Sequence, residues 1–220
     1  MSSADDSPSI LKLGGSLLSL PDIGDRVVSF VDRHCIANPV VVVGGGDAAD
    51  LVRAWAERFQ LSDRAAHDLA LRAMDTNARL LPHLNRRFEL IDTPWDDGIR
   101  PAARRIGVLC CHSVLEKLEV RLPRTQHLPR SWDVTSDSIA AWFAVLWEAE
   151  HLYLLKSADM PGMAPAGRSG PGVIRQVRPH IVRSLVQRGS VDRAFEVFCA
   201  EIPRVAWCNL RGSAEEPHNI

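Results

Sequence analysis

The chain has 220 residues, 46% of them hydrophobic, and a formal net charge of −1 at pH 7. This length is enough to bury a full hydrophobic core, either in one domain or in two small lobes. The nearly neutral charge gives no support to a surface that binds nucleic acid or an anionic membrane. The five cysteines include no C-x-x-C pair, so neither a zinc knuckle nor a disulfide framework is indicated.

No apolar run approaches the roughly 18 residues of a membrane span, and the first residues lack a signal-peptide pattern. The eight histidines are scattered without the spacing of a metal site. We therefore expect a cytoplasmic protein with one domain over residues 1–220, loose ends at about 1–9 and 213–220, and no metal-ligating residues. Neither nucleic acid nor a membrane is expected as a partner. Apolar helix faces favour self-association, so a homo-oligomer is expected.

A short apolar run at 10–13 predicts a buried strand that ends at Gly14 and Gly15, with Ser16 placed to cap a helix. Lys12 interrupts this run. On one interpretation it lies on an edge strand or reaches water, because burying an unpaired ammonium is costly. On the other, its amine lies over the glycine turn, where backbone N–H groups face an anion such as phosphate. This stretch alone leaves both interpretations open.

A second apolar run at 40–43 ends in three glycines, Gly44–Gly46, and Asp47 is placed to cap the amphipathic helix that follows. Two successive strand–glycine–helix units predict an α/β fold with a parallel sheet. The turn also satisfies the dinucleotide fingerprint G-x-G-x-x-A. That fingerprint expects a following strand with an acidic residue about 20 positions on, whereas residues 62–81 have helical spacing. A nicotinamide site is therefore disfavoured, although such a turn can bind any anion.

The helix predicted at 62–81 carries a loose polar stripe, formed by His67, Asp68, Arg72 and Asp75. The favoured interpretation is a solvated face. The alternative is that the stripe forms the wall of a polar cleft.

The remaining elements follow the same logic. Strands are expected at 87–91, 106–111, 152–155 and 205–210, and helices at 112–118, 139–150, 179–187 and 191–201. A loop at 123–129 is expected to bring His127 next to the segment that follows it. A second loop at 161–172, rich in proline and glycine, is expected to be mobile.

A dense polar segment precedes the helix at 139–150: it contains Asp133, Thr135, Ser136 and Asp137. Thr135 or Ser136 is expected to cap the helix, and a carboxylate in its first turn contributes about 0.3–1 kcal/mol. The same composition suits the orientation of a lysine amine or a metal. Lys156 then ends the apolar run at 152–155, and ligands of open α/β sheets bind at such carboxyl ends of strands.

Four motifs, in this order, resemble the amino acid kinase superfamily, which includes aspartate, acetylglutamate, uridylate and isopentenyl phosphate kinases. They are Lys12–Ser16, Val43–Gly46, Thr135–Ser138 and Leu154–Gly162. Within the superfamily, the similarity is greatest to the kinases of methanofuran biosynthesis, which phosphorylate aminomethylfuran-methyl phosphate. The residues that carry this second similarity are Ala66-His67, Ala73–Asp75 and Ser131–Ala140.

The resemblance implies a three-layer αβα sandwich with a mainly parallel sheet, in which ATP and the acceptor meet at the carboxyl edge. It implies an enzyme that uses ATP and Mg²⁺ to phosphorylate a small phosphorylated acceptor. The catalytic residues would be Lys12, which contacts the transferring phosphate, Asp137, which orients the lysine amine, and Lys156. Phosphate and nucleotide would be bound by Gly14, Gly15, Ser16, Ser157, Asp159 and Gly162. The acceptor would be bound by Gly44, Gly45, Gly46, Asp50, Arg53, Asp133, Thr135 and Ser136.

The sequence departs from the superfamily in one respect. Several relatives carry a Gly-Gly-Met-x-x-Lys segment that supplies a second catalytic lysine, whereas residues 170–176 contain none. Arg175 or Lys156 would have to supply that charge, although arginine and lysine differ in geometry. Two alternatives therefore stay open: a kinase for another acceptor, such as uridylate or isopentenyl phosphate, and a non-catalytic protein that binds a nucleotide or anion on the same fold.

Overall fold

The computed structural model of the chain describes residues 7–98, 100–162 and 172–212. Most of the loop expected to be mobile at 161–172, and the outermost parts of the expected loose ends, lie outside these residues. Within the described part of the chain, no helix is both long and apolar enough to span a membrane.

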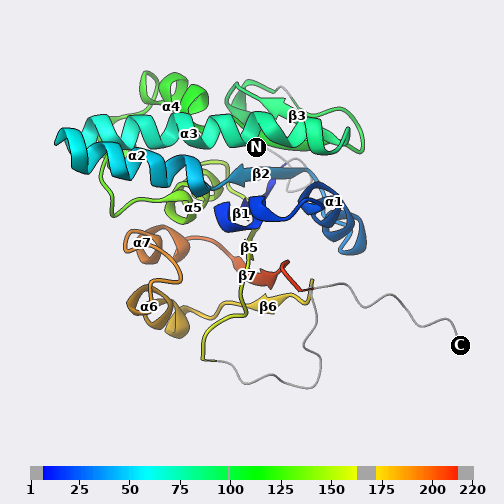
Figure 1. Cartoon of the computed structure of the whole chain (residues 1–220). Helices are drawn as coiled ribbons and strands as arrows, with labels where there is room; N and C mark the ends of the chain where they lie inside the picture. Colours follow the sequence, from blue (N-terminus) through cyan, green and yellow to red (C-terminus); the bar gives the residue numbers. More distant parts are fainter. Residues whose placement is uncertain (1–6, 99, 163–171, 213–220) are drawn as a thin grey trace, which may run out of the picture.

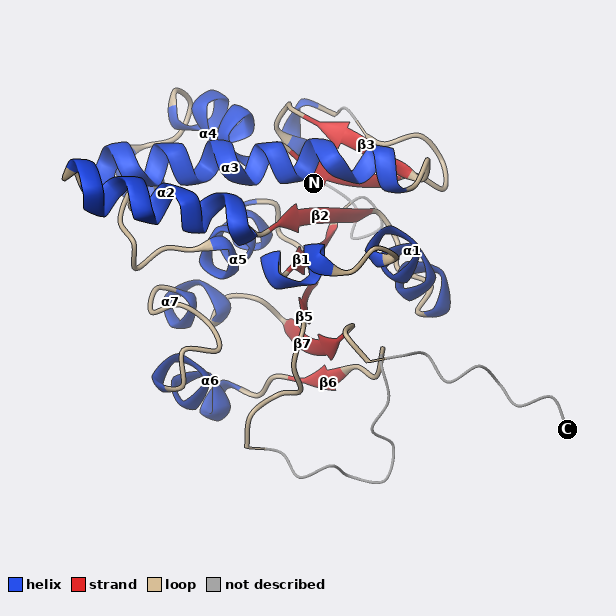
Figure 2. Cartoon of the chain, viewed as in Figure 1, coloured by secondary structure: helices blue, strands red, loops and turns tan. Residues whose placement is uncertain are grey.

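A seven-stranded sheet, counted over the described residues, runs through the molecule in the order β3-β4-β2-β1-β5-β7-β6 (Figures 1 and 2). All its neighbouring strands pair in parallel except β6, which runs antiparallel to β7. The sequence did not predict β6. The strands are β1 (Ser9–Leu13), β2 (Pro39–Val43), β3 (Phe88–Ile91), β4 (Ile106–Leu109), β5 (His151–Lys156), β6 (Arg175–Gln176) and β7 (Arg204–Asn209).

The position of β1 settles where Lys12 lies. This strand pairs with β2 on one side and β5 on the other, and Lys12 is opposite Val42 and Leu154. The interpretation of Lys12 as an edge-strand or solvent-reaching lysine is therefore wrong, since its side chain is buried in the middle of the sheet.

Helices cover both faces of the sheet. Two consecutive residues of β1, Ile10 and Leu11, show this, because successive side chains of a strand point to opposite faces of the sheet. Ile10 belongs to a core that includes residues of α4, α5, α6 and α7, whereas Leu11 belongs to a core built with α1 and the C-terminal part of α3. The expected three-layer αβα architecture is therefore confirmed. The helices are α1 (Ile23–Arg33), α2 (Gly46–Phe59), α3 (Asp63–Leu84), α4 (Cys111–Glu119), α5 (Ser136–Leu146), α6 (Pro179–Gln187) and α7 (Phe195–Cys199).

The longest helix, α3, starts within one residue of its expected range of 62–81, and α6 matches its expected range of 179–187 at both ends. Ser62 caps α3, since its hydroxyl accepts a hydrogen bond from the backbone N–H of Ala65 at 3.3 Å. Helix α2 lies alongside α3 (Figure 1). The pair forms one side of the cavity described below.

Other helix starts differ from the sequence expectation. Gly14 is followed by a 3₁₀ turn, η2 (Gly15–Ser19), and Ser16 caps no helix. Helix α2 begins two residues earlier than expected, at Gly46, so Asp47 lies inside its first turn and Gly45 is the N-cap residue. The strand expected at 106–111 ends at Leu109, because Cys111 already begins α4. Gly46, the first residue of α2, has φ +48°, a left-handed backbone conformation that favours glycine.

The ends of two later helices were also misplaced. Helix α5 begins at Ser136 and ends at Leu146, short of the expected end at 150. Helix α7 covers only Phe195–Cys199, although helical spacing was read over 191–201. The remaining short helical turns are η3 (Trp95–Asp97) and η4 (Arg124–Gln126).

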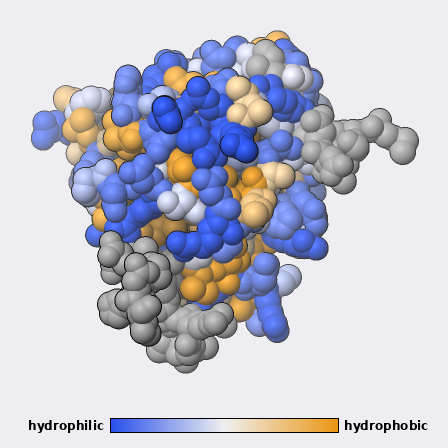
Figure 3. Space-filling view, turned by 90° about the vertical axis from the view of Figure 1, so that its right-hand side faces the viewer, coloured by the Kyte–Doolittle hydropathy of each residue, from blue (hydrophilic) through white to orange (hydrophobic). Residues whose placement is uncertain are grey.

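The carboxyl ends of the parallel strands lie on the side of the molecule that carries α2 (Figure 1). Strand β2 points toward α2, so the carboxyl edge of the sheet lies on that side of the molecule (Figure 1). The face that carries α1 is dominated by hydrophilic side chains, with smaller hydrophobic areas between them (Figure 3).

Candidate active site

Two glycine turns lie in direct contact at the carboxyl edge of the sheet. The N–H of Gly14 donates to the carbonyl of Leu155 at 2.9 Å, and that of Gly44 donates to Leu13 at 2.8 Å. These bonds hold the turns after β1 and β2 against the ends of neighbouring strands. Three of the predicted motifs thus meet at one place.

The contact between the turns explains why glycine is needed there. A Cβ atom added to Gly15 would clash with the backbone nitrogen of Gly46 and lie 2.5 Å from its Cα atom. A Cβ added to Gly44 would lie 2.7 Å from the nitrogen of Gly15. The glycines therefore allow two backbones to touch, which concentrates peptide groups where an anion is expected to bind.

Asn77 on α3 fixes the second turn. Its side-chain amide donates to the carbonyl oxygens of Gly44 at 2.9 Å and Gly45 at 2.8 Å. These two bonds set the orientation of both peptide groups. Sequence reasoning did not assign Asn77 a role, because its partners lie 32 and 33 positions away.

Next to the turns, Asp137 lies between two lysines. Its Oδ1 is 3.0 Å from the Nζ of Lys12, and its Oδ2 accepts a hydrogen bond from the Nζ of Lys156 at 2.8 Å. Lys156 also donates to the carbonyl of Ser190 at 2.9 Å. Asp137 thus contacts both lysine amines, and we call these three residues the Lys12–Asp137–Lys156 array.

The charges of the array are mutually dependent. Burial alone would raise the pKa of Asp137, but the nearby charges of Lys12 and Lys156 outweigh burial and lower it. Burial, followed by repulsion from Lys12, lowers the pKa of Lys156 to about 8, although Asp137 acts in the opposite direction. Two ammonium groups and one carboxylate leave one net positive charge in a buried position beside the glycine turns. Such a site is suited to holding a phosphoryl group.

Asp192 positions the start of α5, and hence Asp137. Its Oδ2 accepts hydrogen bonds from the N–H and the hydroxyl of Thr135, at 3.0 and 2.6 Å, and from the N–H of Ser138 at 3.0 Å. Its Oδ1 accepts from the Ser138 hydroxyl and from the N–H of Phe195. Thr135 is the N-cap residue of α5, as expected, but its side chain makes no capping hydrogen bond, and Asp192 accepts the N–H of Ser138 in its place. Asp192 was missed because it was placed inside a helix, whereas α7 begins only at Phe195.

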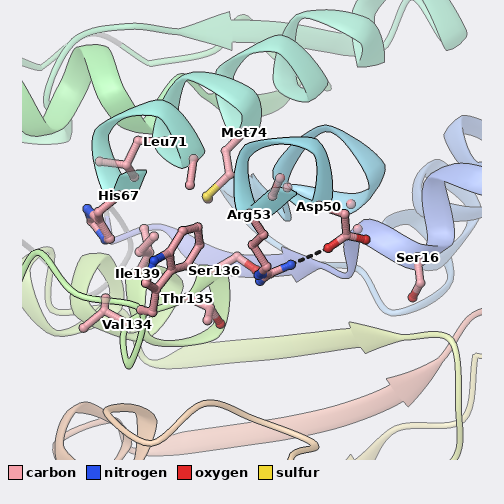
Figure 4. A pocket seen from close by; sticks show the side chains of 16 residues that line it. Ser16, Asp50, Arg53, His67, Leu71, Met74, Val134, Thr135, Ser136 and Ile139 are labelled. Atoms are coloured by element: carbon pink, nitrogen blue, oxygen red, sulfur yellow. Dashed lines mark hydrogen bonds and ion pairs between the residues drawn. The ribbon is translucent and has the colours of Figure 1, made fainter. Parts of the chain in front are cut away.

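A cavity of about 210 Å³ opens beside the turns, between α2, α3 and the segment before α5 (Figure 4). Its wall combines backbone from the glycine turns with polar and apolar side chains. It is lined by Gly15, Ser16, Gly45, Gly46, Ala49, Asp50, Arg53, His67, Ala70, Leu71, Met74, Trp132, Val134, Thr135, Ser136 and Ile139.

Arg53 and Trp132 form the middle of the cavity wall. The guanidinium of Arg53 lies 5.3 Å from the centre of the Trp132 ring and pairs with the carboxylate of Asp50. A cation over an aromatic face is attracted by it. The sequence expected Asp50 and Arg53 near the acceptor, and both line the cavity, but it assigned Trp132 no role.

The polar stripe of α3 is divided between core and surface. Arg72 is exposed, whereas His67 and Asp75 are 3% and 8% exposed, so the interpretation of the whole stripe as a solvated face is wrong. Asp75 caps α4, where it accepts hydrogen bonds from the N–H groups of His112 at 3.0 Å and Ser113 at 3.4 Å. His67 faces the cavity instead.

Two expected neighbours of the site do not reach it. Asp133 is exposed and does not line the cavity. The ring of His127 is hydrogen-bonded to the carbonyl of Leu122 at 3.0 Å, and His127 does not line the cavity.

Of the residues expected on the nucleotide side, Ser16 and Ser157 are in direct contact. The hydroxyls of Ser16 and Ser157 are 2.9 Å apart, which joins the turn after β1 to the end of β5. Asp159 accepts a hydrogen bond from the Asn209 side chain at 3.2 Å, and Gly162 has φ +80°. Over the described residues, no group of three or more His, Cys, Asp or Glu side chains is arranged to hold a metal ion.

Comparison with known proteins agrees with the predicted resemblance. No family model matches the chain. Among curated proteins, it is similar to the [5-(aminomethyl)furan-3-yl]methyl phosphate kinase of Methanocaldococcus jannaschii, with 23% identity over 199 residues that cover 90% of this chain and 85% of that protein.

Solved structures show the same fold. The uridylate kinase from Archaeoglobus fulgidus matches with a TM-score of 0.60 and 18% identity, over 91% of this chain and 90% of that chain. The UMP kinase from Ureaplasma parvum matches with a TM-score of 0.56 and 12% identity, over 92% and 89%. The aspartate kinase from Synechocystis has a TM-score of 0.55 and 14% identity, and the match covers 92% of this chain but 40% of that one. The chain thus shares its fold with uridylate and aspartate kinases, two of the enzymes that the four motifs resemble.

Proposed function

We propose that this chain, which has the fold of the amino acid kinases, is an ATP-dependent phosphotransferase whose acceptor already carries a phosphate group. The observation that carries the proposal is the Lys12–Asp137–Lys156 array beside two touching glycine turns. Phosphoryl transfer mainly requires positioning of the reactants and positive charge near the oxygens of the transferred group. Because an acceptor phosphate oxygen is itself the nucleophile, no covalent enzyme intermediate is needed.

The array also supports a source for the positive charge that a second catalytic lysine supplies in several relatives and that residues 170–176 lack. Lys156 ends β5 and shares Asp137 with Lys12, so two ammonium groups converge although residues 170–176 contain no lysine. Arg175 lies on β6 at the outer edge of the sheet. We therefore assign the second cationic role to Lys156. Asp137 keeps both amines oriented and opposes the lowering of the Lys156 pKa by burial.

The nucleotide would bind on the side of Ser157, Asp159 and Gly162, as a complex of ATP with Mg²⁺. In phosphoryl-transfer enzymes, the metal bridges phosphate oxygens and neutralises their charge. In this proposal the ion arrives with the nucleotide, so no resident metal site is required of the chain. The positive charge of Lys12 and the N–H groups of the Gly14–Gly15 turn would contact the transferred phosphoryl group.

The acceptor that best suits the cavity is [5-(aminomethyl)furan-3-yl]methyl phosphate, on which the Methanocaldococcus jannaschii relative acts. The glycine turns at one end would hold its phosphate, with Arg53 nearby. The walls beyond are apolar or aromatic, formed by Leu71, Met74, Ile139 and Trp132, and suit a small planar ring. Uridylate and isopentenyl phosphate are the alternative acceptors.

The test is ADP release by the purified protein with MgATP and each of three acceptors: the aminomethylfuran phosphate, uridylate and isopentenyl phosphate. Selective turnover of the furan supports the full proposal. Selective turnover of another acceptor retains the phosphotransferase and rejects the furan. ATP binding without turnover of any of the three would favour the non-catalytic alternative and contradict the proposal.

A further inference from the structure

His67 is a buried polar side chain without a partner in the wall of the cavity. It is 3% exposed, and over the described residues neither of its ring nitrogens has a hydrogen-bond partner. It lies on α3 four positions before Leu71 and seven before Met74, and all three line the cavity. Buried polar groups are nearly always hydrogen-bonded, because leaving one unpaired is costly. A ligand in the cavity could supply the partner that the chain does not.

The position of His67 defines which part of a ligand it would meet. Figure 4 shows Ser16, beside the glycine turns, at one end of the cavity and His67 at the other, with Arg53 between them. An acceptor whose phosphate lies at the glycine turns would therefore present its opposite end to the imidazole. The apolar side chains of Leu71 and Met74 would contact the middle of such a molecule.

The surroundings of the ring determine its charge. Burial, followed by repulsion from Arg130, lowers the pKa of His67, although Asp68 and Glu119 act in the opposite direction. The ring is thus neutral near pH 7 and has one nitrogen that accepts a hydrogen bond and one that donates. This makes it a suitable acceptor for an N–H group of a cation.

The charged groups near the ring are paired with one another. His67 also lines a second, small hollow together with Asp68, Glu116, Glu119 and Arg130. Asp68 is paired with Arg72 and His112, and Glu119 with Arg130. The unpartnered ring nitrogens, and not a net charge around them, are therefore what indicates a polar group of the ligand at this end of the cavity.

We infer that His67 determines acceptor specificity by accepting a hydrogen bond from a primary ammonium group at the end of the acceptor remote from its phosphate. This inference rests on the proposed function, because it takes the glycine turns as the phosphate end of the acceptor site. His67 makes no contact with the transferred group in this arrangement. Its role is to discriminate between acceptors.

The experiment compares two ligands that differ only in the amine: [5-(aminomethyl)furan-3-yl]methyl phosphate and (5-methylfuran-3-yl)methyl phosphate. Their dissociation constants are measured by calorimetry, without nucleotide, for the unmodified chain and for His67→Leu, His67→Gln and His83→Leu. His83 is the matched control, since it lies on the same helix and is exposed. Thermal unfolding of each variant confirms that it is folded.

The unmodified chain should bind the amine-bearing ligand more tightly by about 10- to 100-fold, the range for a hydrogen bond to a charged group. His67→Leu should reduce the ratio to below about threefold, His67→Gln should retain part of it, and His83→Leu should leave it unchanged. Equal binding of the two ligands by the unmodified chain, or an undiminished ratio in folded His67→Leu, would overturn the inference.

ADP release with the same two ligands separates this inference from the proposed function. Preferential binding of the amine that depends on His67, without ADP release, would retain the specificity role and reject the kinase. ADP release with both ligands at equal efficiency would retain the kinase and reject the role of His67. Binding of neither ligand would reject the inference.

Discussion

The carboxylate of Asp192 accepts two hydrogen bonds from Thr135, one from its backbone N–H at 3.0 Å and one from its hydroxyl at 2.6 Å. These residues are 57 positions apart in the sequence. The contact fixes the first turn of α5, and Asp137 lies in that turn. A residue outside the cavity thus determines where the carboxylate between the two lysines lies.

Replacing Asp192 should therefore affect both stability and turnover. Asp192→Ala leaves the N–H groups of Thr135 and Ser138 without their partner, so the free energy of unfolding should fall by about 1–3 kcal/mol. Turnover should fall by about tenfold or more, because a displacement of Asp137 misplaces the lysine amines. Denaturant unfolding and steady-state ADP release measure the two effects. Asp63→Ala, at an exposed helix start, is the control and should change neither by much. Unchanged turnover in folded Asp192→Ala would contradict the positioning role.

The small number of lysines allows a well-matched test of the array. The chain has three: Lys12, Lys117 and Lys156. Lys12→Ala should lower turnover by at least about 10²-fold, because it removes a positive charge that acts on the transferred group. Lys117→Ala, outside the site, should retain activity. Near-normal turnover of Lys12→Ala would remove Lys12 from the mechanism.

The lowered pKa of Lys156, about 8, predicts opposite effects of pH on activity and stability. Above pH 8 the folded protein loses the Lys156 charge, so turnover should decline. The unfolded chain keeps this proton up to the ordinary pKa of 10.5, so Lys156 should raise the free energy of unfolding from pH 8 upward. Above the ordinary cysteine pKa of 9.0, buried Cys199 and Cys208, whose pKa values are raised to about 11 and about 12, should lower it. Turnover and denaturant unfolding from pH 7 to 10 measure both trends.

Lys156→Arg separates Lys156 from other titrating groups, because arginine stays charged throughout this range. The turnover that Lys156→Arg retains should therefore not decline above pH 8. A decline at the same pH in Lys156→Arg would assign it to another group.

The contact between the glycine turns predicts a graded effect of alanine. Gly15→Ala places a Cβ atom against the backbone of Gly46, which must move. We expect weaker acceptor and ATP binding and a loss of about 1–3 kcal/mol in the free energy of unfolding. Gly14→Ala should cost less, because Gly14 has φ −60° and its added Cβ would lie 3.2 Å from the Leu155 carbonyl oxygen. Equal stability and binding in the two variants would contradict the proposed role of the contact.

Much of the sheet and the array could be predicted from local sequence. An apolar run followed by glycines identified β1 and β2. Lys12, within the first run, and Lys156, at the end of the run at 152–155, pointed to an anion site at the carboxyl edge of the sheet. These predictions depend on which residues are adjacent in the chain, and on the rule that ends of parallel strands meet. The order of the four motifs also identified the fold.

Local sequence could not predict which polar residues of α3 are buried. The stripe of α3 has polar residues on consecutive turns, and nothing in its spacing separates Arg72, which is exposed, from His67 and Asp75, which are buried. Which of them is covered depends on α4 and on the segment before α5, and these lie far along the chain.

The sequence by itself determined the type of fold, its parallel strands and the residue types available for phosphate chemistry. Only the tertiary structure decided that Lys156 joins Lys12 on Asp137, that Asp192 caps α5, and that His67 faces the cavity without a partner. The physical reason is the range of the interactions. Strand and helix patterns arise from neighbours a few positions apart. Each of these three features depends on groups from distant segments. Packing of the sheet and helices brings the partners of Asp137 and Asp192 within hydrogen-bonding distance and, over the described part of the chain, places none beside His67.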